Sequence, residues 1–327
     1  MTVNLSGTEK HRAARSPSAP GRPRDGRESL RASLKKNWQM YLLLCFPVLA
    51  VIIFCYLPLL GLSIAFLDYD PIGGFANAKF IGLSVFRQVF TSKDFYLVFR
   101  NTMILQFLNL VFSFPAPIIL ALMLNELRAM WFKKVSQTVM YLPHFLSWVV
   151  IASVFYQLLS PTSGTVNILL KGMGLHTIPF LTEPGHWLAT YVAISVWQSM
   201  GWGTILYLSS IAGISEELYE AATVDGAGRW QKMRYVTLPS LRPTIVMLLI
   251  LNLGRIMSIS FEQPYTLGNP MVYSISNVIS TYVYDVGLKA LRYNVATAVG
   301  LFQSVVGFVL VLISDRAAKR LGDSGLI

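Results

Sequence analysis

The stretch that decides the fold of this chain runs Ser215-Glu-Glu-Leu-Tyr-Glu-Ala-Ala-Thr-Val-Asp-Gly-Ala-Gly-Arg-Trp-Gln-Lys-Met-Arg-Tyr-Val-Thr-Leu-Pro-Ser-Leu-Arg-Pro243. It is polar and charged, and it separates two long apolar runs. Ser215 can cap a first helix, and Glu216 and Glu217 then lie in the first turn, where the helix dipole favours negative charge. The stretch therefore begins with a predicted short, capped helix.

The second half of this stretch contains glycines and then prolines. Gly226 and Gly228 allow the backbone to reverse direction, and a second, amphipathic helix can follow them. Pro239 and Pro243 are expected to end that helix before the next apolar run begins. The stretch thus predicts a helix, a turn and a helix between two membrane spans.

The apolar runs on either side belong to a chain with the composition of a membrane protein. Of its 327 residues, 54% are hydrophobic and only 13% are charged, whereas soluble domains have roughly 25% charged residues. Six apolar runs are long enough to cross a hydrocarbon core of about 30 Å. We therefore predict an all-α membrane protein with six transmembrane helices, at about residues 40–66, 102–124, 138–159, 187–212, 244–261 and 295–314.

The basic residues indicate the orientation of these spans. Residues 1–37 contain nine Lys or Arg and lack apolar periodicity, which predicts a disordered tail ahead of a six-span domain at 38–327. Nineteen basic residues fall on the side of the two termini and six on the other side, so the termini are expected to be cytoplasmic. Membrane topology thus accounts for the basic residues behind the net charge of +11. We therefore expect no nucleic-acid partner.

The polar stretch also has a charge pattern that a partner could relieve. Glu216 and Glu220 are spaced i,i+4 and repel each other by about 0.2 to 0.5 kcal/mol in an isolated helix. A basic group on another protein would remove that cost. From the residues alone, a solvated helix face lying on the membrane explains the pattern equally well.

Three short motifs in this stretch resemble a known sequence pattern: Glu220-Ala221-Ala222, Asp225-Gly226-Ala227 and Leu238-Pro239. In this order and spacing they resemble the EAA loop of permeases in binding-protein-dependent ABC importers, here residues 213–243. Four further segments resemble the polysaccharide-permease branch of the maltose-type family: 38–42, 65–71, 261–265 and 278–284.

The resemblance implies a type I ABC importer permease fold in a bacterial inner membrane. It implies a second homologous permease subunit, two cytoplasmic ABC ATPase subunits, an extracytoplasmic solute-binding protein and a carbohydrate substrate. Glu220 would pair with a basic group on the ATPase, and Gly226 would make the sharp turn. The chain has no Walker-type phosphate-binding motif, so ATP and Mg²⁺ are expected on the partner ATPase and no cofactor on this chain.

Polar residues recur along the fifth predicted span: Asn252, Arg255, Ser258 and Glu262. Their spacing would place them on one face of a helix, and an Arg near the bilayer centre costs about 2.5 to 3.5 kcal/mol, so this face should avoid lipid. The face can line a polar cavity, or Arg255 can form an ion pair with Glu262 or with another subunit. Because a neutral sugar needs no fixed cation, Arg255 in the cavity would favour an acidic oligosaccharide such as a uronate polymer.

Two other spans contain aromatic and amide side chains that suit sugar rings. Gln198 and Trp202 lie in the fourth predicted span, and Trp148 and Tyr156 in the third. We include all four as candidate substrate-path residues. At helical spacing such aromatics also serve as packing residues or interfacial anchors.

Two other classes of membrane protein remain as alternatives. A secondary transporter also needs polar groups at mid-membrane depth, but it gives no reason for the EAA-like loop. An intramembrane enzyme would need a nucleophile with a base, or a metal pair, and no such arrangement stands out in the sequence. A transport subunit without catalytic residues therefore fits the sequence best.

Overall fold

The structure is a computed structural model that describes residues 37–320. The disordered tail predicted for residues 1–37 therefore lies outside the described residues, except for Asn37. The chain divides into two compact units between Leu59 and Leu60.

The first unit is helical from its first described residues. Helix α2 (Trp38–Val51) passes directly into the π-helical segment η1 (Ile52–Tyr56), and the 3₁₀ helix η2 (Leu57–Phe66) continues the chain into the second unit. The whole helical stretch Trp38–Phe66 has 29 residues and is strongly apolar. It coincides with the first predicted span and is long enough to cross a bilayer.

The second unit begins with a short hairpin and is otherwise helical. Strand β1 (Leu67–Asp68) pairs antiparallel with β2 (Lys79–Phe80). The helices that follow are α3 (Ser84–Thr91), α4 (Lys93–Leu108), η4 (Asn109–Ser113), α5 (Pro115–Asn125), α6 (Met130–Tyr141), η5 (Leu142–Phe145), α7 (Trp148–Leu159), α8 (Thr165–Gly172), α9 (Pro184–Ala212), α10 (Glu216–Val224), α11 (Arg229–Lys232), η6 (Met233–Thr237), α12 (Leu238–Gly254), α13 (Glu262–Leu267), η7 (Pro270–Val272), α14 (Tyr273–Ser276), α15 (Ile279–Tyr284), η8 (Asp285–Lys289) and α16 (Tyr293–Arg320).

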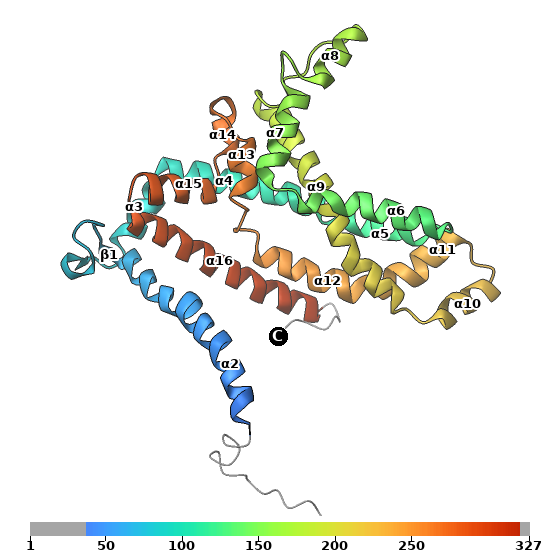
Figure 1. The fold of residues 1–327 in the computed structure, drawn as a ribbon, viewed down its shortest axis with the longest axis horizontal. Helices are drawn as coiled ribbons and strands as arrows, with labels where there is room; N and C mark the ends of the chain where they lie inside the picture. Colours follow the sequence, from blue (N-terminus) through green and yellow to red (C-terminus); the bar gives the residue numbers. More distant parts are fainter. Residues whose placement is uncertain (1–36, 321–327) are drawn as a thin grey trace, which may run out of the picture. The chain divides into compact units, whose positions relative to one another are not determined.

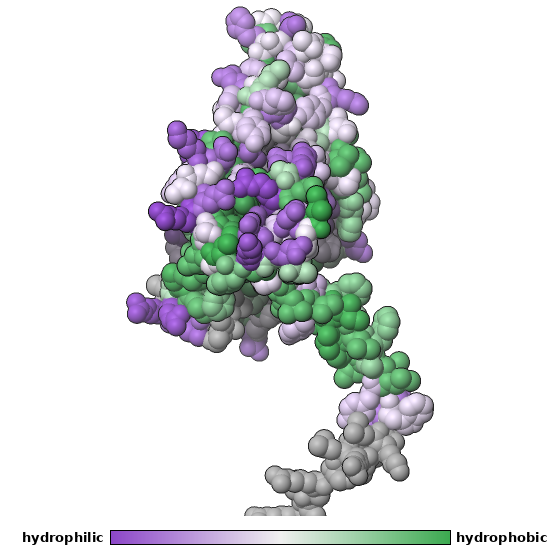
Figure 2. All heavy atoms as spheres, turned by 90° about the vertical axis from the view of Figure 1, so that its left-hand side faces the viewer, coloured by the Kyte–Doolittle hydropathy of each residue, from purple (hydrophilic) through white to green (hydrophobic). Residues whose placement is uncertain are grey.

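Long helices pack side by side within this unit. Helix α5 packs against α9, and α12 packs against α16 (Figure 1). Helices α10 and α11 lie at one end of α12, whereas α13 and α14 follow its other end (Figure 1). Figure 2 views the end of the unit at which β1 and α3 lie, and it shows polar side chains gathered there and apolar side chains along the adjoining faces. This distribution suits a membrane-embedded unit with one end in water.

The helices confirm an all-α membrane protein. Four stretches of the described chain are long and apolar enough to be spans: Trp38–Phe66, Lys93–Asn125, Arg229–Gly254 and Tyr293–Arg320. A bent pair, Met130–Phe145 with Trp148–Leu159, makes a fifth if it counts as one span. The remaining predicted span falls on α9, which has 29 residues and is not among these apolar stretches.

The third predicted span, 138–159, is not one straight helix. The chain bends by 102° between Met130–Phe145 and Trp148–Leu159. Pro143 lies in the 3₁₀ turn η5, where it supplies no N–H to an α-helical hydrogen bond. Ser147 then starts α7 as its N-cap, and its Oγ accepts from the N–H of Val150 at 3.4 Å. The sequence did not predict this bend, because the residues on both sides of it are apolar and hydropathy carries no information about the direction of a helix.

The fifth predicted span, 244–261, ends earlier than expected. Helix α12 stops at Gly254, and Arg255 has non-helical dihedral angles of φ −97° and ψ 7°. The apolar residues beyond it, Met257 and Ile259, are buried in the protein rather than exposed to lipid. The prediction that Ser258 and Glu262 continue a single helical face is therefore wrong.

Pro239 and Pro243 do not end the second helix of the polar stretch. The chain is helical without interruption from Arg229 to Gly254. Pro239 lies in the first turn of α12, where a missing N–H is tolerated, directly after the π-helical segment η6. Pro243 lies inside α12. The expected stop between loop and span is thus a continuous helical connection.

Three glycines allow close helix crossings. A Cβ at Gly201 of α9 would collide with the carbonyl oxygen of Met140 at the end of α6. A Cβ at Gly254 would collide with Val311, and one at Gly307 would lie 2.7 Å from the Gly254 carbonyl oxygen. The main chains of α12 and α16 therefore meet directly at the point where α12 ends.

Candidate functional site

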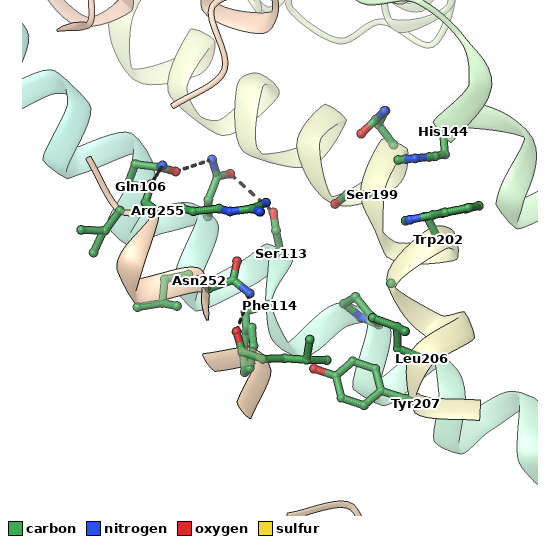
Figure 3. A pocket seen from close by; sticks show the side chains of 17 residues that line it. Gln106, Ser113, Phe114, His144, Ser199, Trp202, Leu206, Tyr207, Asn252 and Arg255 are labelled. Carbon is green, nitrogen blue, oxygen red and sulfur yellow. Dashed lines mark hydrogen bonds between the residues drawn. The ribbon is translucent and has the colours of Figure 1, made fainter. Parts of the chain in front are cut away.

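A polar cavity of about 460 Å³ lies between α9, the end of α12 and the helical stretch Lys93–Asn125, which comprises α4, η4 and α5 and is called span two below. Figure 3 shows the 17 side chains that line it, and none of them is Asp or Glu. Cavities of this size accommodate small ligands. Its polar lining comprises Gln106, Asn109, Ser113, His144, Gln198, Ser199, Asn252 and Arg255.

Arg255 provides the positive charge of this cavity. It follows the last residue of α12, and its side chain projects into the cavity (Figure 3). Its backbone carbonyl accepts from the N–H of Ser258 at 2.8 Å and from Gln106 Nε2 at 3.2 Å, and Gln303 Nε2 donates to the carbonyl of Met257 at 2.7 Å. The side chains of Gln106 and Gln303 thus hold the main chain just beyond the end of α12.

Within residues 37–320, no carboxylate forms an ion pair with Arg255. Glu262, the partner considered from the sequence, begins α13 and does not line the cavity. An arginine always remains protonated. The cavity therefore presents a cation that no described acidic side chain neutralises.

A row of polar side chains faces the cavity from span two. The π-helical segment η4 interrupts this span, and Ser113 Oγ donates to Asn109 Oδ1 at 3.4 Å. Asn109 Nδ2 in turn donates to Gln106 Oε1 at 3.5 Å. Both bonds are long, so these amides keep capacity to bind a polar ligand.

The opposite wall combines amide and aromatic groups. Gln198, Ser199 and Trp202 come from α9. The imidazole of His144 stacks on the indole of Trp202, with ring centroids 4.6 Å apart and planes 6° apart. Trp202 remains 47% exposed, so part of this stacked surface is accessible to a ligand.

The structure brings four of the eight predicted path residues together in the cavity: Gln198, Trp202, Asn252 and Arg255. The other four lie elsewhere. Ser258 is in the irregular segment after α12, and Glu262 starts α13. Trp148 packs against an apolar core, and Tyr156 donates its hydroxyl to the carbonyl of Leu267 at 3.2 Å. These two aromatics connect α7 to its neighbours.

Sequence reasoning missed the polar row of span two and His144. Gln106, Asn109 and Ser113 are polar residues at spacings of three and four within an apolar run. This is the same signal that singled out span five. His144 gave no comparable signal, because its stacking on Trp202 depends on the bend between α6 and α7.

The first helix of the EAA loop is confirmed. Ser215 is the N-cap of α10, and its Oγ accepts from the N–H of Glu217 at 3.3 Å. Gly226 has φ +77°, in the left-handed region that glycine tolerates. The N–H groups of Gly226 and Ala227 donate back to the carbonyls of Thr223 and Ala222 at 3.0 and 2.9 Å, which closes the end of α10.

Side-chain bonds hold α10 against the helix that follows it. Tyr219 and Thr237 hydroxyls are 2.9 Å apart, and Lys232 Nζ donates to Thr223 Oγ1 at 2.7 Å. The two helices of the EAA loop are thus tied to each other and, through η6, to α12.

The outer surface of the loop is exposed and mixed in character. Glu220 is exposed, and within the described chain its carboxylate forms no ion pair. Val224 and Trp230 are 89% and 69% exposed. Exposed apolar side chains around a free carboxylate are typical of a protein contact surface.

Comparisons with known proteins give a consistent result. Residues 113–323 match the family described as "binding-protein-dependent transport system inner membrane component". The chain is 41% identical over 298 residues to Protein LplB of Bacillus subtilis (strain 168), covering 91% of this chain and 94% of the relative. It is 39% identical to the polygalacturonan/rhamnogalacturonan transport system permease protein YteP of the same organism, covering 93% and 94%.

Solved structures are similar over nearly the whole chain. One is a bacterial alginate ABC transporter in complex with an alginate pentasaccharide-bound periplasmic protein. It is 39% identical with a TM-score of 0.83, and the match covers 91% of this chain and 100% of that one. A second, a bacterial ABC transporter involved in the import of the acidic polysaccharide alginate, is 40% identical with the same TM-score.

Proposed function

Because this chain belongs to the family of binding-protein-dependent transport system inner membrane components, we propose that it is a permease subunit importing acidic oligosaccharides or polysaccharides. Relatives named for polygalacturonan and alginate transport support an acidic carbohydrate. The observation that carries the charge preference is Arg255, a cation without a described acidic partner in a polar cavity.

The cavity has the chemistry to hold a passing uronate. A guanidinium can bind a carboxylate with two parallel hydrogen bonds. The amides of Asn109, Gln198 and Asn252 can exchange hydrogen bonds with sugar hydroxyls. The Trp202–His144 stack offers an aromatic face to the apolar side of a pyranose ring.

The energy for transport comes from other chains in this proposal. This subunit and a second permease form the path, two cytoplasmic ATPases bind ATP and Mg²⁺, and a solute-binding protein delivers the sugar. Glu220 meets a basic group on one ATPase. The tied EAA helices and the uninterrupted helix Arg229–Gly254 pass ATPase movement on to Arg255 as a rigid-body shift.

The function is tested on the complex purified from its native membrane through a tag on this chain. We expect an ABC ATPase to co-purify, and the reconstituted complex with its binding protein to import a galacturonic acid trimer only when ATP is supplied. The carboxyl-reduced trimer should enter at least several-fold more slowly. Uptake driven by an ion gradient without ATP would identify a secondary transporter instead.

The proposed orientation places the EAA loop in the cytoplasm and α8 outside. In a variant lacking Cys45 and Cys55, Lys171→Cys in α8 should react with a membrane-impermeant maleimide in intact cells. Arg229→Cys in α11 should react only after the cells are permeabilised. Labelling of both positions in intact cells contradicts the orientation.

A further inference from the structure

A second cavity, of about 440 Å³, lies in the segment between α12 and α16. It is formed by α13, α14, α15 and η8, and it shares no lining residue with the cavity around Arg255. This segment follows the end of α12 that is opposite the EAA loop (Figure 1). With the EAA loop in the cytoplasm, the second cavity faces the extracytoplasmic side.

Hydrogen bonds to the main chain and between side chains hold residues that line this second cavity. Asn269 donates from Nδ2 to the carbonyl of Leu181 at 2.8 Å, and its Oδ1 accepts from the N–H of Met271 at 3.0 Å. Thr281 Oγ1 donates to Asn277 Oδ1 at 2.7 Å. The cavity is therefore built into the fold, as ligand sites usually are.

One wall of the second cavity is aromatic and accessible. Tyr265 is 45% exposed and Tyr273 is 51% exposed. Tyr265 stacks on Phe261, with centroids 4.6 Å apart, and meets Tyr284 edge-on at 5.4 Å. These contacts orient the Tyr265 ring and leave part of its surface open. Tyrosine rings bind the apolar face of a sugar and offer a hydroxyl at the rim.

A lysine held in place lies beside this wall. Lys289 Nζ is 2.8 Å from Asp285 Oδ1 and lies 5.0 Å from the Tyr284 ring centroid and 5.7 Å from that of Tyr265. The hydrogen bond to Asp285 raises the pKa of Lys289 above its ordinary value, so the ammonium keeps its charge. One carboxylate occupies one of three donors, and the side chain remains 56% exposed. Lys289 can therefore donate a hydrogen bond to a second carboxylate, that of a ligand.

We propose that this cavity binds a uronate unit of an acidic oligosaccharide, with its carboxylate on Lys289 and its ring on Tyr265. The inference rests on the proposed function and adds an extracytoplasmic subsite, ahead of Arg255, for the same substrate. Asp285 accepts a hydroxyl of the sugar and limits the net positive charge of the site. The lower net charge weakens the binding, so the oligosaccharide can leave this subsite and pass on to the cavity around Arg255.

The test uses the assembled transporter in nanodiscs without the solute-binding protein. Direct binding of a galacturonic acid trimer, and of the same trimer with its carboxylates reduced to alcohols, is measured by titration calorimetry. Lys289→Gln should weaken binding of the acidic trimer about fivefold and leave the reduced trimer unchanged. Lys289→Arg should restore binding of the acidic trimer. Tyr265→Leu should weaken binding of both trimers. Lys171→Gln, an exposed lysine outside both cavities, is the matched control.

The outcomes separate this proposal from others. Unchanged affinity of Lys289→Gln and Tyr265→Leu for the acidic trimer overturns the subsite. A second titration adds the ligand-free binding protein to the same complexes. If Lys289→Gln and Tyr265→Leu lose affinity only for that protein, the cavity serves protein docking and the subsite is overturned. A wild-type complex that imports the acidic trimer while binding none of it directly also overturns the subsite and leaves the proposed function intact. A wild-type complex that imports no acidic trimer refutes the proposed function itself.

Discussion

Glu220→Lys is expected to lower ATP-driven uptake by about a hundredfold while the permease still inserts and folds. The side chain is exposed, so the substitution disturbs no internal contact. If the carboxylate meets a basic group on the ATPase, reversing its charge replaces an attraction with a repulsion worth several kcal/mol. The measurement is uptake in reconstituted vesicles, together with the amount of ATPase that co-purifies.

Glu217→Lys is the matched control, because it makes the same charge change on an exposed residue of the same helix. It should retain most of the uptake. Gly226→Val should resemble Glu220→Lys, since a β-branched residue at φ +77° is strained although there is open space around it. Gly226→Asn should be milder. Wild-type uptake by Glu220→Lys would remove the loop from the mechanism.

Arg255→Gln is expected to reduce uptake of an acidic oligosaccharide by ten- to about a hundredfold and to spare its carboxyl-reduced analogue. The estimate follows from the loss of charge-assisted hydrogen bonds worth about 1.5 to 3 kcal/mol. Glutamine keeps hydrogen-bonding capacity and removes the charge. The measurement is initial uptake of both substrates, side by side, by complexes of equal ATPase content.

Arg255→Lys separates charge from geometry in the same assay. Lysine keeps the charge and loses the planar pair of donors, so uptake of the acidic substrate should be intermediate. If Arg255→Gln imports each substrate at the rate of the wild-type complex, Arg255 has a structural role at the end of α12.

The sequence predicted the EAA loop well because short-range physics decides its shape. The cap at Ser215 and the turn at Gly226 each depend on a few neighbouring residues. The prediction that Pro239 and Pro243 end the second helix was wrong because their effect does not depend on neighbouring residues alone. Whether a proline ends a helix depends on the hydrogen bonds around it, and η6 before Pro239 supplies a turn in which its missing N–H is tolerated.

Hydropathy located the spans and could not decide where they bend or stop. The run through Met257 and Ile259 is apolar because it is buried in the protein, and its composition matches that of a lipid-facing helix. The cavity depends on this difference. Arg255 reaches the polar row of span two only because α12 stops one residue earlier, and Gln106 and Gln303 come from distant parts of the chain.

The main-chain crossing at Gly254 and Gly307 has a mechanical consequence. Because neither Gly254 nor Gly307 has a side chain to separate the two main chains, the crossing can act as a pivot, and it lies at one end of a lever that begins at Arg229. The long arm measures about 37 Å at 1.5 Å per residue, whereas the short arm is the side chain of Arg255. A swing of about 10° would displace the loop by about 6 Å and the guanidinium by only about 1 Å. If an ATPase drives the loop as proposed, such a reduction would turn a large movement of the ATPase into a small one at the cavity, large enough to break a hydrogen bond to a carboxylate and small enough to keep the helices packed.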